Sequence, residues 1–141
     1  MEIEFKIIEF LIYLILVTSI IIFLVKIYKA KTRKEKIYKK IIIIMINVFL
    51  MINLLIFDYS HKTYFKYNDW AILGSQIDNV REKYGEFDRG NIKYGESGEV
   101  AYYIYTDNSP IMPDHLPRYY FICYDKDGVV YEVYVSGPPG G

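Results

Sequence analysis

The chain has 141 residues, of which 52% are hydrophobic and 18% aromatic, and its 17 basic and 17 acidic residues give a formal net charge of zero. The total hides an asymmetry, because residues 1–57 carry nine basic and four acidic residues (+5) and residues 58–141 carry eight basic and thirteen acidic residues (−5). The acidic second part argues against a nucleic-acid partner, and a single cysteine, Cys123, excludes an internal disulfide.

Two long apolar runs fill most of the first 57 residues. The first extends over about residues 7–27, and between Phe10 and Val25 its only ionisable group is the phenol of Tyr13. The second, residues 41–57, contains thirteen Ile, Leu, Val or Phe residues. Because a helix of about 20 apolar residues spans the roughly 30 Å of a bilayer core, we predict a membrane protein with a transmembrane helical hairpin over residues 1–57. Two buried helices of a soluble protein are the alternative, but the remaining chain is too short and too polar to cover them.

A basic segment, residues 26–40, separates the two runs and carries eight basic residues against one acid. Loops rich in Lys and Arg stay in the cytoplasm, so we expect this loop inside, and both termini and residues 58–141 outside. The composition, rich in Ile, Lys, Asn and Tyr, is typical of an AT-rich bacterium, and we therefore expect a multi-pass protein of a bacterial cell membrane. The lipid bilayer is its first expected partner, and the basic loop would also attract anionic headgroups.

Polar side chains within the two runs are expected to face the other helix, because lipid offers them no hydrogen-bond partner. Counting depth from the cytoplasmic ends, at about 1.5 Å per residue, places Asn47 level with Ser19 and Asn53 level with Tyr13. The two asparagines do not lie on the same strip of an ideal helix, so one of them could instead face a second copy of the protein. The predicted packing residues are Tyr13, Thr18, Ser19, Asn47 and Asn53.

A short helix is predicted after the hairpin. Residues 58–69 are expected to be a juxtamembrane linker whose aromatic side chains suit the headgroup layer. Ser75, followed three residues later by Asp78, resembles a capping box and predicts a helix over residues 76–84 that ends at Gly85. One face of this helix is apolar, so it must pack on another element.

Four segments rich in tyrosine and β-branched residues follow: 91–94, 100–106, 118–124 and 129–135. They predict a three- to four-stranded antiparallel sheet, so that residues 70–136 form a small α+β domain with a flexible tail at 137–141. The last two strands are joined by a turn in which Asp125 pairs with Val129. In that register Cys123 would face Tyr131, and Tyr120, Tyr124 and Tyr134 would share the opposite side of the sheet.

The sequence contains no pattern of a catalytic, cofactor-binding or metal site. The Asp125–Gly128 turn lacks the further acidic ligands of a calcium loop. His115 lies near Asp107 and Asp114, but no nucleophile or second histidine accompanies it. Cys123 is expected to be a small core residue. We therefore predict neither an enzyme nor a cofactor.

The order of these motifs resembles the small outer-membrane lipoprotein family that includes the BamE assembly factor, and the related β-lactamase-inhibitor fold. The resemblance covers residues 70–136 and implies helices packed on an antiparallel sheet that binds proteins without catalysis. Two features depart from the family, because its glycine-x-proline is here Gly85-Glu86-Phe87 and its lipidated N-terminal cysteine is absent. The matching residues are Gly74-Ser75 before the helix, Val80 within it, Tyr84-Gly85 at its end, and Tyr124-Asp125-Lys126-Asp127-Gly128-Val129-Val130 in the hairpin.

Two functions are expected from these features. The first is a membrane-anchored accessory module whose outer domain binds an unknown protein or a second copy of the chain through exposed tyrosines. The alternative for that tyrosine face is that another segment, such as residues 107–117, covers it. The second function is a small membrane-active or immunity-type protein that acts by oligomerisation of its hairpin through Asn47 and Asn53. The predicted partner surface consists of Tyr103, Tyr105, Tyr120, Tyr124 and Tyr134.

Overall fold

The computed structural model describes residues 2–32, 37–106 and 115–137, and the chain divides into two compact units, Met1–Phe57 and Asp58–Gly141. Part of the basic segment, residues 33–36, lies outside the described residues, as do the acidic neighbours of His115 at 107 and 114 and most of the predicted tail.

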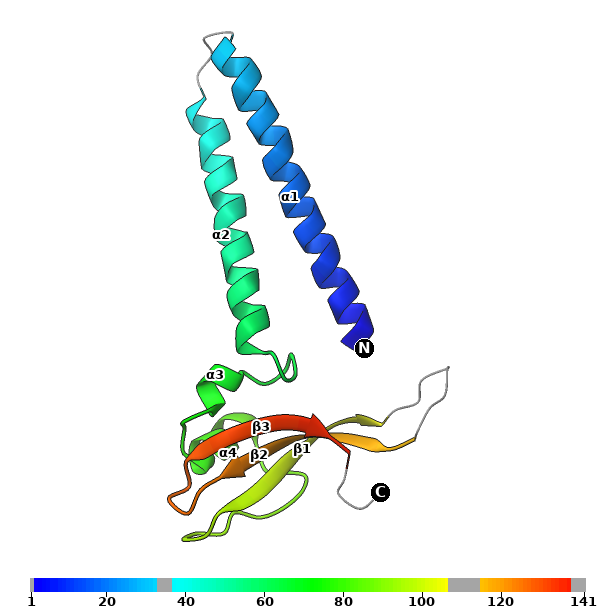
Figure 1. Cartoon of the computed structure of the whole chain (residues 1–141), viewed down its shortest axis with the longest axis vertical. Coiled ribbons are helices and arrows are strands. Elements are labelled where there is room, and N and C mark those ends of the chain that lie inside the picture. Colours follow the sequence, from blue (N-terminus) through cyan, green and yellow to red (C-terminus); the bar gives the residue numbers. More distant parts are fainter. Residues whose placement is uncertain (1, 33–36, 107–114, 138–141) are drawn as a thin grey trace. The chain divides into compact units, whose positions relative to one another are not determined.

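The first unit is a hairpin of two helices, α1 (Glu2–Thr32) and α2 (Tyr38–Ser60), shown in blue and cyan to green in Figure 1. Both helices are long and apolar enough to cross a membrane, over Lys6–Lys31 and Tyr38–Ser60. Most of their apolar side chains are exposed, whereas Leu16 and Ala30 are buried. The predicted spans at 7–27 and 41–57 fall within these two helices.

The second unit is a small α+β fold, as predicted. It contains α3 (Asp69–Ile72), α4 (Ile77–Tyr84), β1 (Gly98–Thr106), β2 (Pro117–Tyr124) and β3 (Val130–Ser136). The strands form an antiparallel sheet in the order β1-β2-β3 (Figure 1). Residues 91–94, predicted as a further strand, are irregular.

Helix α4 confirms the predicted helix, but its start differs. The N-cap residue is Gln76, which makes no side-chain capping bond. Ser75 instead donates its hydroxyl over 2.7 Å to the carbonyl of Ile72, the last residue of the preceding helix α3. At the other end Gly85, with φ of 95°, is the C-cap, and its N–H donates to Arg81.

The turn between β2 and β3 has the predicted form. The N–H of Asp125 donates to the carbonyl of Val129 over 3.0 Å. Gly128, with φ of 77°, occupies the left-handed region and donates its N–H to the Asp125 carbonyl over 3.0 Å. A glycine is favoured there because its missing Cβ removes the steric penalty of a positive φ.

The register beyond this turn differs from the predicted one. Tyr124 pairs with Val130, but Cys123 pairs with Glu132, so Tyr131 is an extra residue that forms a β-bulge. The predicted pair of Cys123 and Tyr131 was therefore wrong. A single inserted residue exchanges the faces of all later side chains of a strand, so Tyr134 lies on the opposite side of the sheet from Tyr120 and Tyr124.

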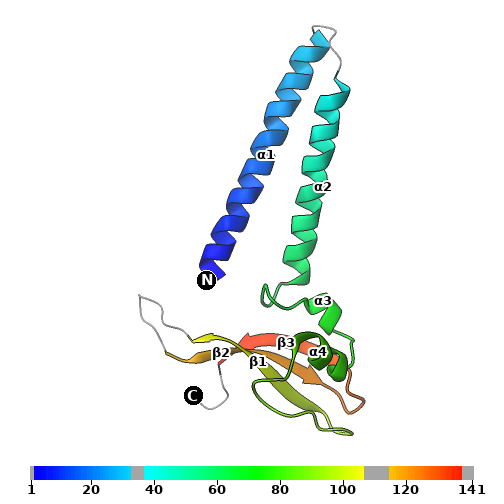
Figure 2. The ribbon, with the colours of Figure 1, turned by 180° about the vertical axis from the view of Figure 1, so that it is seen from behind.

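The hydrophobic core lies between one face of the sheet and the helices α3 and α4, which both lie on that face (Figure 2). Tyr64 and Tyr67, expected in a linker at the headgroup layer, are also part of this core, with 7% and 1% of their surface exposed. Tyr67 contacts three further tyrosine rings, at centroid distances of 4.5–5.3 Å. The central core residues are Tyr67, Ile72, Ile77, Val80, Val100, Tyr102, Tyr120, Ile122, Tyr124 and Val130.

Candidate functional site

Tyr120, predicted as part of a binding surface, is completely buried. Its hydroxyl donates to Oδ1 of Asp69 over 2.7 Å, and Oδ2 of the same carboxylate accepts the N–H of Thr63 over 2.7 Å. Burial, followed by the hydrogen bond to Asp69, raises the pKa of Tyr120. The three residues thus connect the centre of the sheet, helix α3 and the segment that follows α2.

Tyr124 is also buried, with 1% of its surface exposed. Its hydroxyl accepts the N–H of Lys93 over 2.9 Å and donates to the carbonyl of Asn91 over 3.4 Å. A Cβ atom at Gly98 would collide with this phenol, so the close approach of β1 requires a glycine. The assignment of Tyr120 and Tyr124 to an exposed surface was therefore wrong, because the helices α3 and α4 pack on the side of the sheet that carries both side chains. Residues 65–84 supply much of the cover, and most of the segment 107–117, which was expected there, lies outside the described residues.

The opposite side of the sheet carries Tyr103 and Tyr134, two further tyrosines of the predicted surface. Tyr103, 45% exposed, packs edge-on against Tyr119 with ring centroids 5.8 Å apart. The row continues from Tyr119 to Phe121 at 6.0 Å and from Phe121 to Tyr134 at 5.1 Å, where the rings are stacked. We name Tyr103, Tyr119, Phe121 and Tyr134 the aromatic row. Tyr105 lies beyond an irregularity in β1, opposite Arg118.

A carboxylate organises one end of the aromatic row. Oε2 of Glu99 accepts the hydroxyl of Tyr134 over 2.5 Å and the thiol of Cys123 over 3.6 Å. Burial and then the charge of Glu99 raise the pKa of Cys123 to about 11, so the thiol is protonated at neutral pH and is a poor nucleophile. The hydrogen bond to Glu99 likewise raises the pKa of Tyr134. Glu99, Tyr134 and Cys123 therefore hold the aromatic row in place, and neither the thiol nor the phenol is an activated nucleophile.

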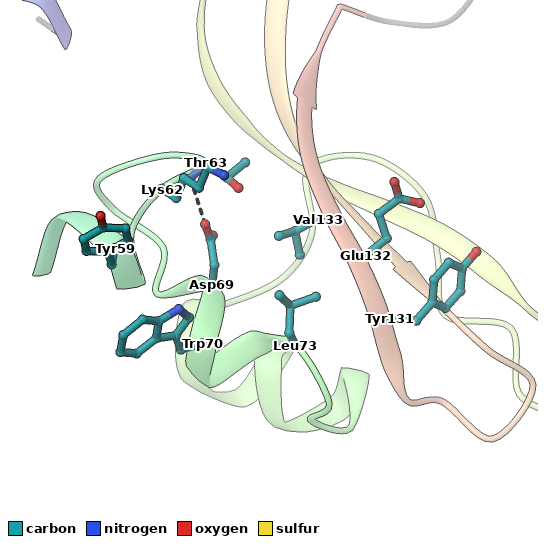
Figure 3. A pocket seen from close by; sticks show the side chains of 9 residues that line it. All are labelled: Tyr59, Lys62, Thr63, Asp69, Trp70, Leu73, Tyr131, Glu132 and Val133. Atoms are coloured by element: carbon teal, nitrogen blue, oxygen red, sulfur yellow. Dashed lines mark hydrogen bonds between the residues drawn. The ribbon is translucent and has the colours of Figure 1, made fainter. Parts of the chain in front are cut away.

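A pocket of about 290 Å³ lies beside strand β3 (Figure 3). Leu73 and Val133 lie toward its centre, and Trp70, which is 60% exposed, stands at one side. Lys62 also lines the pocket, and Tyr131 and Glu132 line it from the strand. The sequence did not predict this pocket, because its residues come from segments that are distant along the chain.

In the hairpin, Asn47 donates to Oγ of Ser19 over 3.2 Å, which is the pair expected from the depth count. Asn47 also donates to the carbonyl of Ile43 and is 9% exposed. Thr18 instead donates to the Leu14 carbonyl of its own helix.

The second asparagine of α2 is placed differently. Asn53, expected level with Tyr13, is exposed and donates to the Phe49 carbonyl of its own helix over 2.7 Å. Tyr13 itself is half-buried.

The buried carboxylate of Asp69 was not predicted from the sequence, because residues 58–69 were expected to be a linker. Asn68 could have indicated a helix that begins at Asp69, because its side chain accepts the N–H of Ala71 over 3.0 Å as the N-cap of α3. Among the described residues, no group of three or more His, Cys, Asp and Glu side chains could hold a metal ion.

Comparisons with protein-family models, with curated proteins and with solved structures found no match to this chain. The resemblance to the family that includes BamE therefore stays a prediction.

Proposed function

We propose that the protein is a membrane-anchored accessory module of a bacterial cell membrane, in which the hairpin spans the bilayer and the second unit binds another protein outside the cytoplasm. Two helices of sufficient length and apolar character support the anchor. The excess of basic residues at 26–40 supports a cytoplasmic loop between them. The acidic second unit is then on the outer side.

The aromatic row is the observation that carries the binding function. Helices α3 and α4 lie on one face of the sheet (Figure 2). The aromatic row follows the other face. The accessible members of the row are its tyrosines, since Tyr103 is exposed and Tyr119 and Tyr134 are half-buried, whereas Phe121 is only 2% exposed. Tyrosine side chains supply large contact areas with few rotatable bonds, and for this reason they are enriched at protein interfaces. The contacts of Glu99 with Tyr134 and of the rings with one another hold these side chains in defined positions before a partner binds.

The chemistry of this face supports binding rather than catalysis. The thiol of Cys123 is only 8% exposed and its pKa is raised, and the phenol of Tyr134 is also held in its neutral form. Neutral hydroxyl groups on flat rings make hydrogen bonds at the edge of an interface while the rings bury apolar area.

Site-specific photo-crosslinking in intact membranes tests the proposal. A photoreactive phenylalanine analogue is placed at Tyr103, at Tyr134 and, as a matched control, at Tyr94. Tyr94 is 73% exposed but lies outside the aromatic row, where its hydroxyl contacts Asp78. We expect the first two positions to give the same adduct and the control to give none. Identical products at all three positions, or none at Tyr103 and Tyr134, would refute the binding surface.

A second function, oligomerisation of the hairpin, is favoured by one observation. Asn53 is exposed on α2, whereas Asn47 is used within the hairpin. In lipid an exposed amide stabilises contact with another helix by about 0.6–2 kcal/mol. If the hairpin oligomerises, Asn53→Leu should abolish chemically crosslinked dimers in membranes, whereas Asn47→Leu should leave them in place. Equal dimer yields in both variants and in the unaltered chain would argue against this role.

A further inference from the structure

The two edges of the sheet differ in how their outward backbone groups are paired. The order β1-β2-β3 makes β1 and β3 edge strands. Along an edge strand, the N–H and C=O groups of every second residue point away from the sheet and can pair with another chain. Proteins usually cover such groups, so an edge strand with unpaired outward groups at defined positions is a candidate site for pairing with another chain.

The edge of β1 is covered. Arg89 pairs with Ala101 through two backbone hydrogen bonds, of 3.0 and 2.8 Å. Two residues further on, the outward N–H of Tyr103 donates to Oδ2 of Asp88 over 2.7 Å. Two outward positions of this edge, Ala101 and Tyr103, are therefore occupied by the segment before the strand.

In the part of the chain that the structure describes, the edge of β3 is covered only at its beginning. The carbonyl of Val130 accepts the N–H of Gly74 over 2.8 Å, and the N–H of Val130 donates to Ser75 over 2.9 Å. Since these groups of Val130 point outward, those of its partner Tyr124 point toward β1.

The same alternation along β2 identifies the open positions. Counting two and four residues back from Tyr124 gives Ile122 and Tyr120, whose backbone groups also point toward β1. Their partners on β3 are Val133 and Val135, so the N–H and C=O groups of these two valines point away from the sheet. Within residues 2–32, 37–106 and 115–137, no backbone hydrogen bond outside the sheet reaches either valine. Val135 is also 38% exposed.

The pocket of about 290 Å³ adjoins this open edge. Val133 belongs to both, and Leu73 stands beside it in the pocket (Figure 3). An added strand would present every second side chain to the same side, and the apolar centre of the pocket suits one such side chain if it is apolar. Glu132 on the same strand, in a unit with eight basic and thirteen acidic residues, favours a basic residue next to it.

We propose that the open edge of β3 binds an extended segment of a partner protein as a fourth strand. Its backbone pairs with Val133 and Val135, an apolar side chain enters the pocket, and a neighbouring Lys or Arg faces Glu132. The inference rests on the proposed function in requiring a protein partner, but it concerns the edge of the sheet and not the aromatic row. A second copy of β3 is a poorer occupant, because the only charged residue of that strand is Glu132.

The test uses the full chain in detergent micelles and a fluorescent hexapeptide of alternating lysine and valine. Val135→Pro removes one outward N–H without removing a bond to β2, and Val135→Thr is the matched control that keeps the N–H. We expect the peptide to bind the unaltered chain and the threonine variant equally, and the proline variant about 5- to 10-fold more weakly, as the loss of one hydrogen bond implies. Amide hydrogen exchange should slow at residues 133 and 135 when the peptide is bound.

Three results would overturn the inference. The first is equal binding by the proline and threonine variants, with both folded as judged by circular dichroism. The second is protection that appears along β1 rather than at residues 133 and 135. The third is protection of these two amides before any peptide is added, which would show that the chain or a second copy already occupies the edge. None of these results affects crosslinking at Tyr103 and Tyr134, so failure of the edge site and failure of the proposed function are distinguishable.

Discussion

The bond between Tyr120 and Asp69 gives the sharpest stability prediction. Tyr120→Phe removes the hydroxyl that donates to a carboxylate with only 5% of its surface exposed. Hydrogen bonds to charged groups contribute about 1.5–3 kcal/mol, and the buried oxygen would lose this donor without gaining access to water. Asp69 keeps the N–H of Thr63 as a partner. We therefore expect the free energy of unfolding of the second unit to fall by about 2 kcal/mol.

Thermal unfolding of the full chain in detergent measures this change. The single tryptophan, Trp70, follows Asp69 directly and reports local unfolding through its fluorescence. For a unit of 84 residues, spanning Asp58–Gly141, a loss of about 2 kcal/mol lowers the midpoint by roughly 8–16 °C. Tyr103→Phe is the matched control, because its hydroxyl bonds Thr106 at an exposed site, and should cost less than about 0.5 kcal/mol.

A double-mutant cycle isolates the pair itself. If the bond stabilises the unit, the combined variant of Tyr120→Phe and Asp69→Asn should lose less stability than the sum of the two single variants, by at least about 0.5 kcal/mol. Equal midpoints for the phenylalanine variants at 120 and 103, or strictly additive effects in the cycle, would refute the reasoning.

Three further predictions follow from the same unit. Gly98→Ala should destabilise it by about 1–3 kcal/mol in urea unfolding, because the new Cβ collides with the Tyr124 phenol, whereas Gly137→Ala should have little effect. Burial raises the pKa of Tyr67 from 10.0 to about 12, because the folded unit favours the neutral phenol. The contribution of this neutral phenol to the free energy of unfolding is complete below pH 10 and is lost as the pH rises toward 12. A titration of tyrosinate absorbance with circular dichroism should therefore show unfolding in this window, and a unit that stays folded above pH 12 would contradict it. The Cys123 thiol, with its pKa raised from 9.0 to about 11, should hold about 100-fold less thiolate than an ordinary cysteine, so a disulfide reagent at mildly alkaline pH should label the folded chain at least that much more slowly than the unfolded chain.

Local patterns explain why the helical parts were predictable. The apolar runs of α1 and α2 are long enough to cross a membrane, and runs of this length are typical of helices rather than strands. Helix α4 has an apolar face at helical spacing and a glycine at its end, and its predicted and observed bounds differ by one residue. The contact of Asn47 with Ser19 could be expected because depth along two antiparallel helices follows from counting residues.

The buried side of the sheet could not be predicted in the same way. Strand β2 is apolar or aromatic on both faces, with Tyr119, Phe121 and Cys123 on one side and residues 120, 122 and 124 on the other. Hydrophobic alternation therefore does not distinguish the two registers. Contacts with helix residues such as Ile72, Ile77 and Val80 select the face with residues 120, 122 and 124, and the bulge at Tyr131 places Tyr134 on the other face.

From composition, charge and periodicity alone, the chain determines two long apolar helices, a basic segment between them and a separate acidic α+β unit, because each of these depends only on residues that are close along the chain. Only the tertiary structure decided that Tyr120 and Tyr124 are core residues, that Asp69 is a buried hydrogen-bond acceptor, and that the edge of β3 is open beside a pocket. These features arise where distant segments meet, and the free energy of packing them, rather than any local preference, selects one arrangement.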